Sequence, residues 1–302
     1  METIDKEKIR ETVRERYGSI AKAGGVTPET KPAASCCAPS VVQKEVLPMA
    51  SCCAPAVEAP KTEATCCGTD DFSVEKMAAY MGKLGYSKED LASVPEGANM
   101  MLGCGNPLAL ASVKPGETVV DLGSGGGFDC FLAAKEVGET GRVIGVDMTS
   151  DMISKARRNV EKIQATNVEF RLGEIEHLPI ADNTADIIMS NCVINLSPDK
   201  ISVYRDAYRV LKPGGRLAIS DVVATAPLPE DIKSNLALLS ACIGGAATIE
   251  DTEEMLRQAG FQNISVKSND KSREIIREWD PGKARKATDY IVSAYIEARK
   301  PS

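Results

Sequence analysis

The stretch that decides the fold runs from Thr118 to Asp129 and reads TVVDLGSGGGFD. It begins as an apolar segment typical of a buried strand, passes into a glycine-rich turn, and continues as a helical pattern over 127–137. Glycines let a backbone pass close to a ligand, because they carry no Cβ to collide with it. The stretch therefore predicts a strand, a ligand-binding turn and a helix, in that order.

The alternation of strands and helices continues downstream. The pattern predicts strands at 117–121, 142–147, 167–171, 185–190 and 215–220, and helices at 127–137, 150–164 and 199–211. This βαβ rhythm indicates an α/β domain with a doubly wound, mostly parallel sheet. After Pro229 we expect a helix that carries Leu236, Leu238, Leu239 and Ile243, then a helix at 250–259 and strands at 262–267 and 289–298.

The glycine-rich turn departs from the dinucleotide fingerprint, because Phe128 stands where the third glycine is needed. Its Asp-x-Gly-x-Gly-x-Gly pattern instead resembles the first motif of class I S-adenosylmethionine methyltransferases. The resemblance implies a seven-stranded sheet whose last strands form an antiparallel edge hairpin. It also implies that Asp121, Gly123, Gly125 and Gly127 hold the aminoacyl end of S-adenosylmethionine.

Two further segments match the same cofactor. Asp147 ends the second strand, just before Met148, where a carboxylate can accept hydrogens from both ribose hydroxyls. After the third strand, Ile175 and Glu176 occupy the place where the family binds adenine. We expect His177 only to border this loop, because the chain has no second histidine with which to build a catalytic pair or metal cluster.

Composition excludes several classes of partner. The formal charge of -7 disfavours nucleic acid, and no stretch approaches the roughly 18 apolar residues that span a bilayer. The first two dozen residues lack the apolar segment of a signal peptide, so we expect a cytoplasmic protein. In that reducing compartment its ten cysteines should be thiols, which points to metal, metalloid or redox chemistry.

The chain is predicted to have four parts. Residues 1–24 contain an amphipathic helix at 4–22, and residues 25–70 form a flexible, cysteine-rich linker. Residues 71–225 form the cofactor-binding domain with preceding short helices, and residues 226–302 form an acceptor-site cap and the strands that complete the sheet.

The linker carries three pairs of adjacent cysteines, Cys36-Cys37, Cys52-Cys53 and Cys66-Cys67. Adjacent cysteines differ from the Cys-x-x-Cys pairs of zinc ribbons, which disfavours a structural zinc site. The linker is either an inert tail or a segment that captures soft ions, which thiolates favour. The sequence leaves that choice open.

The acceptor should bind near the segment 190–200, because ligands of open α/β sheets lie outside the carboxyl ends of the strands. This segment contains Asn191, which we expect to contact the cofactor, and Cys192. The Asn-Pro-Pro-Tyr sequence that base and amine methyltransferases often place here is absent.

Here the chain resembles the arsenite methyltransferase family across residues 71–302. The resemblance rests on the segments 103–107, 121–129, 191–200 and 241–246. It implies methyl transfer from S-adenosylmethionine to thiol-bound trivalent arsenic, as a detoxification reaction. It further implies that Cys104, Cys192 and Cys242 bind arsenic or take part in the accompanying redox step, with Cys67 of the upstream pair as a further participant. Leu102 stands where the family often has tyrosine, so the resemblance does not extend to an aromatic contact with the cofactor at this position.

Trivalent arsenic attacks with a lone pair, so no general base is needed. The attack formally oxidises arsenic, and vicinal thiols can return two electrons by forming a disulfide. Cys104 with Cys192, or Cys66 or Cys67 with either, are the expected donors, and thioredoxin or small thiols would restore them. We expect a monomer.

Competing interpretations remain at this stage. Cys130, inside the predicted helix, is interpreted as a small core residue, which a single buried cysteine usually is. A methyltransferase acting on carbon or oxygen of a quinone or other small molecule would explain the cofactor segments but not the cysteines. A metalloid-binding or redox protein without turnover would explain the cysteines but transfer no methyl group.

Overall fold

The computed structural model describes residues 5–24, 74–277 and 288–302. The predictions for the linker and for Cys36, Cys37, Cys52 and Cys53 lie outside the described residues, as do those for Cys66 and Cys67. None of the described helices is both long enough and apolar enough to cross a bilayer.

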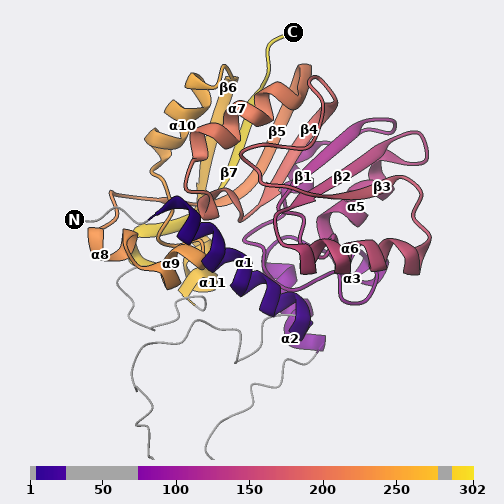
Figure 1. The fold of residues 1–302 in the computed structure, drawn as a ribbon, viewed down its shortest axis with the longest axis horizontal. Coiled ribbons are helices and arrows are strands. Elements are labelled where there is room, and N and C mark those ends of the chain that lie inside the picture. Colours follow the sequence, from indigo (N-terminus) through magenta and orange to yellow (C-terminus); the bar gives the residue numbers. More distant parts are fainter. Residues whose placement is uncertain (1–4, 25–73, 278–287) are drawn as a thin grey trace, which may run out of the picture.

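A seven-stranded sheet forms the centre of the fold (Figure 1). Its strands are β1 Thr118–Leu122, β2 Arg142–Asp147, β3 Val168–Leu172, β4 Ala185–Asn191, β5 Leu211–Ala224, β6 Gln262–Asn269 and β7 Ile291–Arg299. They lie in the order β3-β2-β1-β4-β5-β7-β6. The first five pair in parallel, whereas β7 pairs antiparallel with both β5 and β6, which confirms the predicted sheet with its edge hairpin.

Helices cover both faces of the sheet. One layer contains α4 Pro107–Ala111, α5 Phe128–Val137 and α6 Ser150–Ile163, and the other contains α7 Lys200–Val210 and α10 Ile249–Gln258. Neighbouring residues of β1 serve opposite layers, because side chains alternate along a strand. Val119 packs with the α5 and α6 side, whereas Val120 and Leu122 pack with α7 and α10.

The order in which the chain adds strands to the sheet reverses at β1, which lies between the parallel strands β2 and β4. Asp121 is in register with Gly145 of β2 and with Met189 of β4. The loops that leave these parallel strands therefore meet at one edge of the sheet, which is where open α/β sheets bind their ligands.

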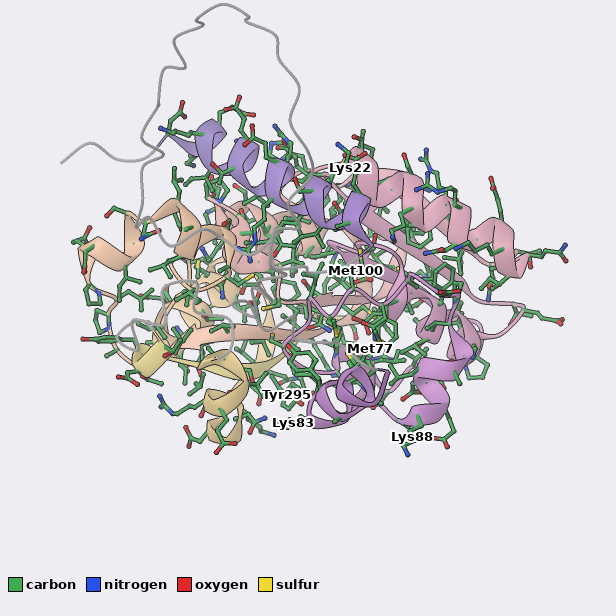
Figure 2. All side chains as sticks on the ribbon, turned by 90° about the horizontal axis from the view of Figure 1, so that it is seen from below. Lys22, Met77, Lys83, Lys88, Met100 and Tyr295 are labelled. Carbon is green, nitrogen blue, oxygen red and sulfur yellow. The ribbon has the colours of Figure 1, made fainter. Side chains whose placement is uncertain are left out.

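The N-terminal helix α1, Lys6–Ala23, lies against this edge (Figure 1). The Asp5 side chain caps it by accepting from the Glu7 backbone N–H at 3.1 Å. Its apolar face buries Val13 and Ile20, and the helix contacts α6. Figure 2 shows Met100 lying below the end of α1 that carries Lys22.

The predicted helix after Pro229 is wrong in its extent. The structure has two short helices, α8 Glu230–Lys233 and α9 Leu236–Ser240, and the second ends before Ile243. Asn235 causes the break, because its side chain accepts from the backbone N–H groups of Ala237 and Leu238 and starts a new helix. Cys242 consequently lies in a turn.

The remaining elements are short. They are α2 Val74–Lys83, α3 Lys88–Ser93, η1 Ile194–Leu196, η2 Asp270–Ser272, α11 Arg273–Arg277 and η3 Thr288–Tyr290. Of these, η1 matters most for the site, because it follows β4 directly and contacts α1, α7 and α9.

Candidate active site

A cavity opens at the edge of the sheet where the loops after β1, β2 and β4 meet, and α1 forms one of its walls. The loop after β1 contributes Gly123, Ser124, Gly125 and Gly126, and the loop after β2 contributes Met148 and Thr149. Arg10, Val13 and Tyr17 of α1 also line it.

The glycine-rich turn is held against β2. Gly123 and Ser124 both donate backbone hydrogen bonds to the Val146 carbonyl, at 2.7 and 3.0 Å. Gly123 has a φ of 69° and lies against the Val193 side chain, which leaves no room for a Cβ. Gly127 is not among the residues lining the cavity; it has a φ of 93° at the start of α5 and packs against Phe131.

Buried carboxyl groups gather around the cavity. Asp147 lines it and accepts from the backbone N–H groups of Gly125 and Thr149, at 3.0 and 2.8 Å. Burial, followed by the neighbouring charge of Asp129, raises the pKa of Asp121 well above its usual value. Burial also raises the pKa of Asp129 and of Asp147. A cationic ligand would offset the cost of these crowded negative charges.

Among the described residues that line the cavity, two buried polar atoms have neither a hydrogen-bond nor an ion-pair partner, the Oγ of Ser124 and the Nδ2 of Asn99. Buried polar groups are normally paired, so these two indicate a polar ligand. S-adenosylmethionine fits this environment, because it combines a sulfonium, an ammonium, a carboxylate and ribose hydroxyls.

The segment after β3 supplies another wall. Ile175 and Glu176 both line the cavity, as the sequence suggested. The Glu176 carboxylate is occupied by protein groups, because it accepts from Ser197 Oγ at 2.6 Å and pairs with Arg10 Nη2 at 3.6 Å. His177 is exposed and does not line the cavity.

Asn191, at the end of β4, lines the cavity but uses its amide to hold the loop that carries Cys104. Its Oδ1 accepts from the Cys104 backbone N–H at 3.0 Å, and its Nδ2 donates to the Gly105 carbonyl at 2.9 Å and to Asp129 Oδ2 at 3.0 Å. The glycines on either side of Cys104 are required by close packing, since a Cβ on Gly103 would meet Asn191.

Three cysteines converge beside the cavity although they come from separate segments. Cys104 precedes α4, Cys192 follows β4 and lines the cavity, and Cys242 follows α9. The sulfur atoms of Cys104 and Cys192 and a carboxylate oxygen of Asp221 all lie within 4.8 Å of one another. The Cys242 thiol donates to the Cys192 carbonyl at 2.8 Å.

The three thiols are buried, with 3 to 4% of each residue exposed. Burial raises the pKa of Cys104, and hydrogen bonds with Cys104 and Cys242 raise the pKa of Cys192 well above its usual value. These two cysteines are therefore neutral thiols near pH 7, ready to exchange their protons for a soft electrophile.

Some residues of the site were not predicted. The sequence indicated that α1 could pack on a larger body, but not that Arg10, Val13 and Tyr17 would line the cavity. The available signal was the apolar stripe of α1, which predicts a buried face without naming its partner. Cys130 was interpreted as a core residue; it is fully buried, and its thiol also donates to Asp121 Oδ2 at 3.2 Å.

Comparison with known proteins agrees with this geometry. Residues 113–260 match the family model described as a methyltransferase domain. The arsenite methyltransferase of Halobacterium salinarum is 50% identical over 298 residues, covering 99% of this chain and 68% of that protein. The arsenite methyltransferase of Aquipseudomonas alcaligenes is 45% identical over 174 residues, 55% of this chain and 50% of that protein.

Among solved structures, an arsenic(III) S-adenosylmethionine methyltransferase from Chlamydomonas reinhardtii superposes with a TM-score of 0.55 at 33% identity. The match covers 74% of this chain and 73% of that one. The chain thus spans about two thirds of the halobacterial relative but only 50% of the one from Aquipseudomonas.

Proposed function

Because this chain belongs to the arsenite methyltransferase family and is thereby an S-adenosylmethionine-dependent methyltransferase, we propose that its acceptor is trivalent arsenic bound by Cys104, Cys192 and Cys242. The observation that carries the proposal is the convergence of these three thiols beside the cofactor cavity. Soft thiolate ligands are those that a soft metalloid prefers.

The first task of the site is to exchange ligands on arsenic. Each thiol proton leaves with the hydroxide that the sulfur replaces, so three thiols and arsenous acid give a tris-thiolate and three waters. The raised pKa values of Cys104 and Cys192 keep both groups protonated until this exchange. No general base is then needed, which agrees with the absence of histidine from the residues lining the cavity.

The second task is to align the bound arsenic with the methyl carbon of the cofactor. When bound, S-adenosylmethionine supplies an electrophilic methyl carbon, on which the arsenic lone pair can act. Asp121 and Asp147 provide buried carboxylates for the cationic and hydroxyl groups of that cofactor, while Asn191 fixes the Cys104 loop. Such alignment of two reactants contributes several kcal/mol to a rate enhancement.

The third task is redox. Methylated arsenic has lost two electrons in the formal sense, and two thiolates can return them by pairing as a disulfide. Cys104 and Cys192 are suited to this step by their sulfur separation of no more than 4.8 Å. A small thiol or thioredoxin would reduce that disulfide, and we place the reaction in the cytoplasm because such reductants operate there. The role of Cys67 and the monomeric state remain predictions.

The experiment combines purified protein, methyl-labelled S-adenosylmethionine, a thiol and arsenite, followed by separation of the arsenical products. Cys192→Ser and Cys242→Ser should each abolish methylation and leave cofactor affinity within about twofold of the original. Full methylation by either variant would overturn the thiol-ligand proposal. Arsenite binding without labelled product would instead favour a metalloid-binding protein, and a labelled quinone in place of an arsenical would favour the other acceptor class.

A further inference from the structure

Tyr17 of α1 has no part in the chemistry described so far, yet it lies at the acceptor site. Its ring packs in the apolar cluster that contains all three site cysteines, together with Val13 of the same helix. It also lines the same cavity as Cys192. A residue from the N-terminal helix thus contacts the region where the acceptor binds.

Cys242 lies in a turn, outside any helix or strand. It follows a five-residue helix, has a φ of 63°, and its thiol points as a donor at the Cys192 carbonyl, 2.8 Å away. Once this sulfur binds arsenic it has no proton left to donate. The sulfur and the carbonyl oxygen are then two acceptors at close range, so the sulfur must turn away and needs a new donor.

Tyr17 is placed to be that donor. Its ring packs against the cluster that contains Cys242, and an ordinary phenol titrates near pH 10, so the hydroxyl keeps its proton at neutral pH. α1 is also tied to the Cys242 segment, because Arg16 Nη1 donates to Ser240 Oγ at 3.1 Å. Lys200 also lies near Cys242 but, unlike Tyr17, does not line the cavity.

We propose that the Tyr17 hydroxyl donates a hydrogen bond to the Cys242 sulfur when that sulfur binds the acceptor, which makes Tyr17 a positioning residue of the acceptor site. This inference rests on the proposed function. It gives α1 a direct part in acceptor binding, beyond covering the cofactor cavity.

The test compares Tyr17→Phe, which removes only the hydroxyl, with Lys22→Ala as a matched control. Lys22 lies on the same helix and pairs with Asp151 at 3.2 Å, but it does not line the cavity. Calorimetry of the full chain should show arsenite affinity about tenfold weaker for Tyr17→Phe, the usual effect of one hydrogen bond to a charged group. S-adenosylmethionine affinity should fall by less than that, because the ring that lines the cavity is kept. Lys22→Ala should bind both ligands as the original chain does.

Arsenic X-ray absorption provides a second readout, the number of sulfur and oxygen atoms bound to arsenic. Weaker packing of α1 alone would not change that number. The original chain should show three sulfur neighbours around arsenic, and Tyr17→Phe should show a mixture in which oxygen replaces one of them. Three sulfur neighbours in Tyr17→Phe together with original affinity would overturn the inference.

A double-mutant cycle separates this inference from the proposed function. Cys242→Gly suits the left-handed backbone at that position and removes the sulfur. Adding Tyr17→Phe to Cys242→Gly should weaken arsenite binding no further, because the hydroxyl has lost its partner. An equal loss in both backgrounds would show that Tyr17 does not act through Cys242. If Cys242→Gly itself binds and methylates arsenite normally, the proposed function fails instead.

Discussion

Cys192 and Cys242 both adopt left-handed backbone conformations, with φ values of 60° and 63°, and the thiol of the second donates to the carbonyl of the first. Such conformations are uncommon outside glycine and cost of order 1 kcal/mol for other residues. Outliers of this kind cluster at functional sites. Cys192 and Cys242 are two of the three proposed acceptor ligands, and Met101, which lines the same cavity, has a φ of 57°.

The first prediction concerns this strain. Cys192→Gly should be about 1 kcal/mol more stable than Cys192→Ala, because glycine adopts a φ of 60° without the Cβ penalty while both variants lose the thiol. Urea unfolding of the two variants measures the difference. Equal stabilities would mean that the backbone relaxes when the sulfur is removed.

The second prediction concerns Asn191. Asn191→Ala should lower the free energy of unfolding by about 2 kcal/mol and reduce arsenite methylation more than cofactor affinity, because it releases the Cys104 loop. Asn167→Ala is the control, since Asn167 also donates to two carbonyls, those of Ala134 and Gly138, but does not line the cavity. The same activity loss in both variants would argue against a specific role for Asn191.

The third prediction concerns Cys130, whose thiol donates to the Asp121 carboxylate beside the cofactor cavity. Cys130→Ser keeps a donor and should retain S-adenosylmethionine affinity. Cys130→Ala is as small as Cys130→Ser but also loses the donor, which raises the pKa of Asp121 further and should weaken cofactor binding severalfold. Calorimetry measures the S-adenosylmethionine affinity of both variants. Identical affinities would mean that Cys130 contributes only to packing.

The fourth prediction concerns pH. Burial raises the pKa of Asp221 to about 6, above the value of roughly 3.9 for an unfolded aspartate. The folded state therefore holds the proton more tightly, and this contribution to stability is complete below about pH 4 and is lost as the pH rises through about 6. The two pKa values correspond to about 3 kcal/mol.

Urea unfolding at several pH values tests this in the original chain and in Asp221→Asn. Between pH 4 and pH 7 the original chain should lose about 2 kcal/mol of stability relative to the variant, because part of the total change lies below pH 4. The comparison uses the change in unfolding free energy with pH, not its value at one pH. Asparagine cannot accept every hydrogen bond that Asp221 accepts from Ile194, Asn195 and Val222, so the two chains differ in stability at any pH. Parallel curves would exclude the titration of Asp221 in this range.

The sheet could be predicted from the sequence because local patterns determine it. The second strand was expected at 142–147 and is found at Arg142–Asp147. A short apolar run between turn signals is too short for a typical helix and therefore indicates a strand. The fifth strand, expected at 215–220, extends over Leu211–Ala224, because antiparallel pairing with β7 continues it to Ala224 and Leu211 pairs with Ala185 of β4. That pairing joins residues far apart in the chain, so no local sequence pattern predicts it.

The site was predictable only in part, for the same reason. The glycine-rich turn and Asp147 follow from their position after strands, whereas the meeting of Cys104 with Cys192 and Cys242 came from a family resemblance. Asn191 was expected to contact the cofactor, and no local pattern reveals that its amide holds the Cys104 backbone across 87 residues. Tyr17 was overlooked because an apolar stripe on a helix predicts burial but not the neighbour.

The separation of the three thiols along the chain affects how the protein accumulates in a cell. Cys192 and Cys242 are 50 residues apart, so the proposed threefold site forms only after folding, whereas adjacent cysteines such as Cys66-Cys67 offer two sulfurs even in an unfolded chain. A ligand that binds the folded state more tightly than the unfolded one stabilises the folded state by mass action. The toxic metalloid would thereby protect the enzyme that removes it from unfolding and proteolysis, and folded enzyme would become more abundant as the poison rises.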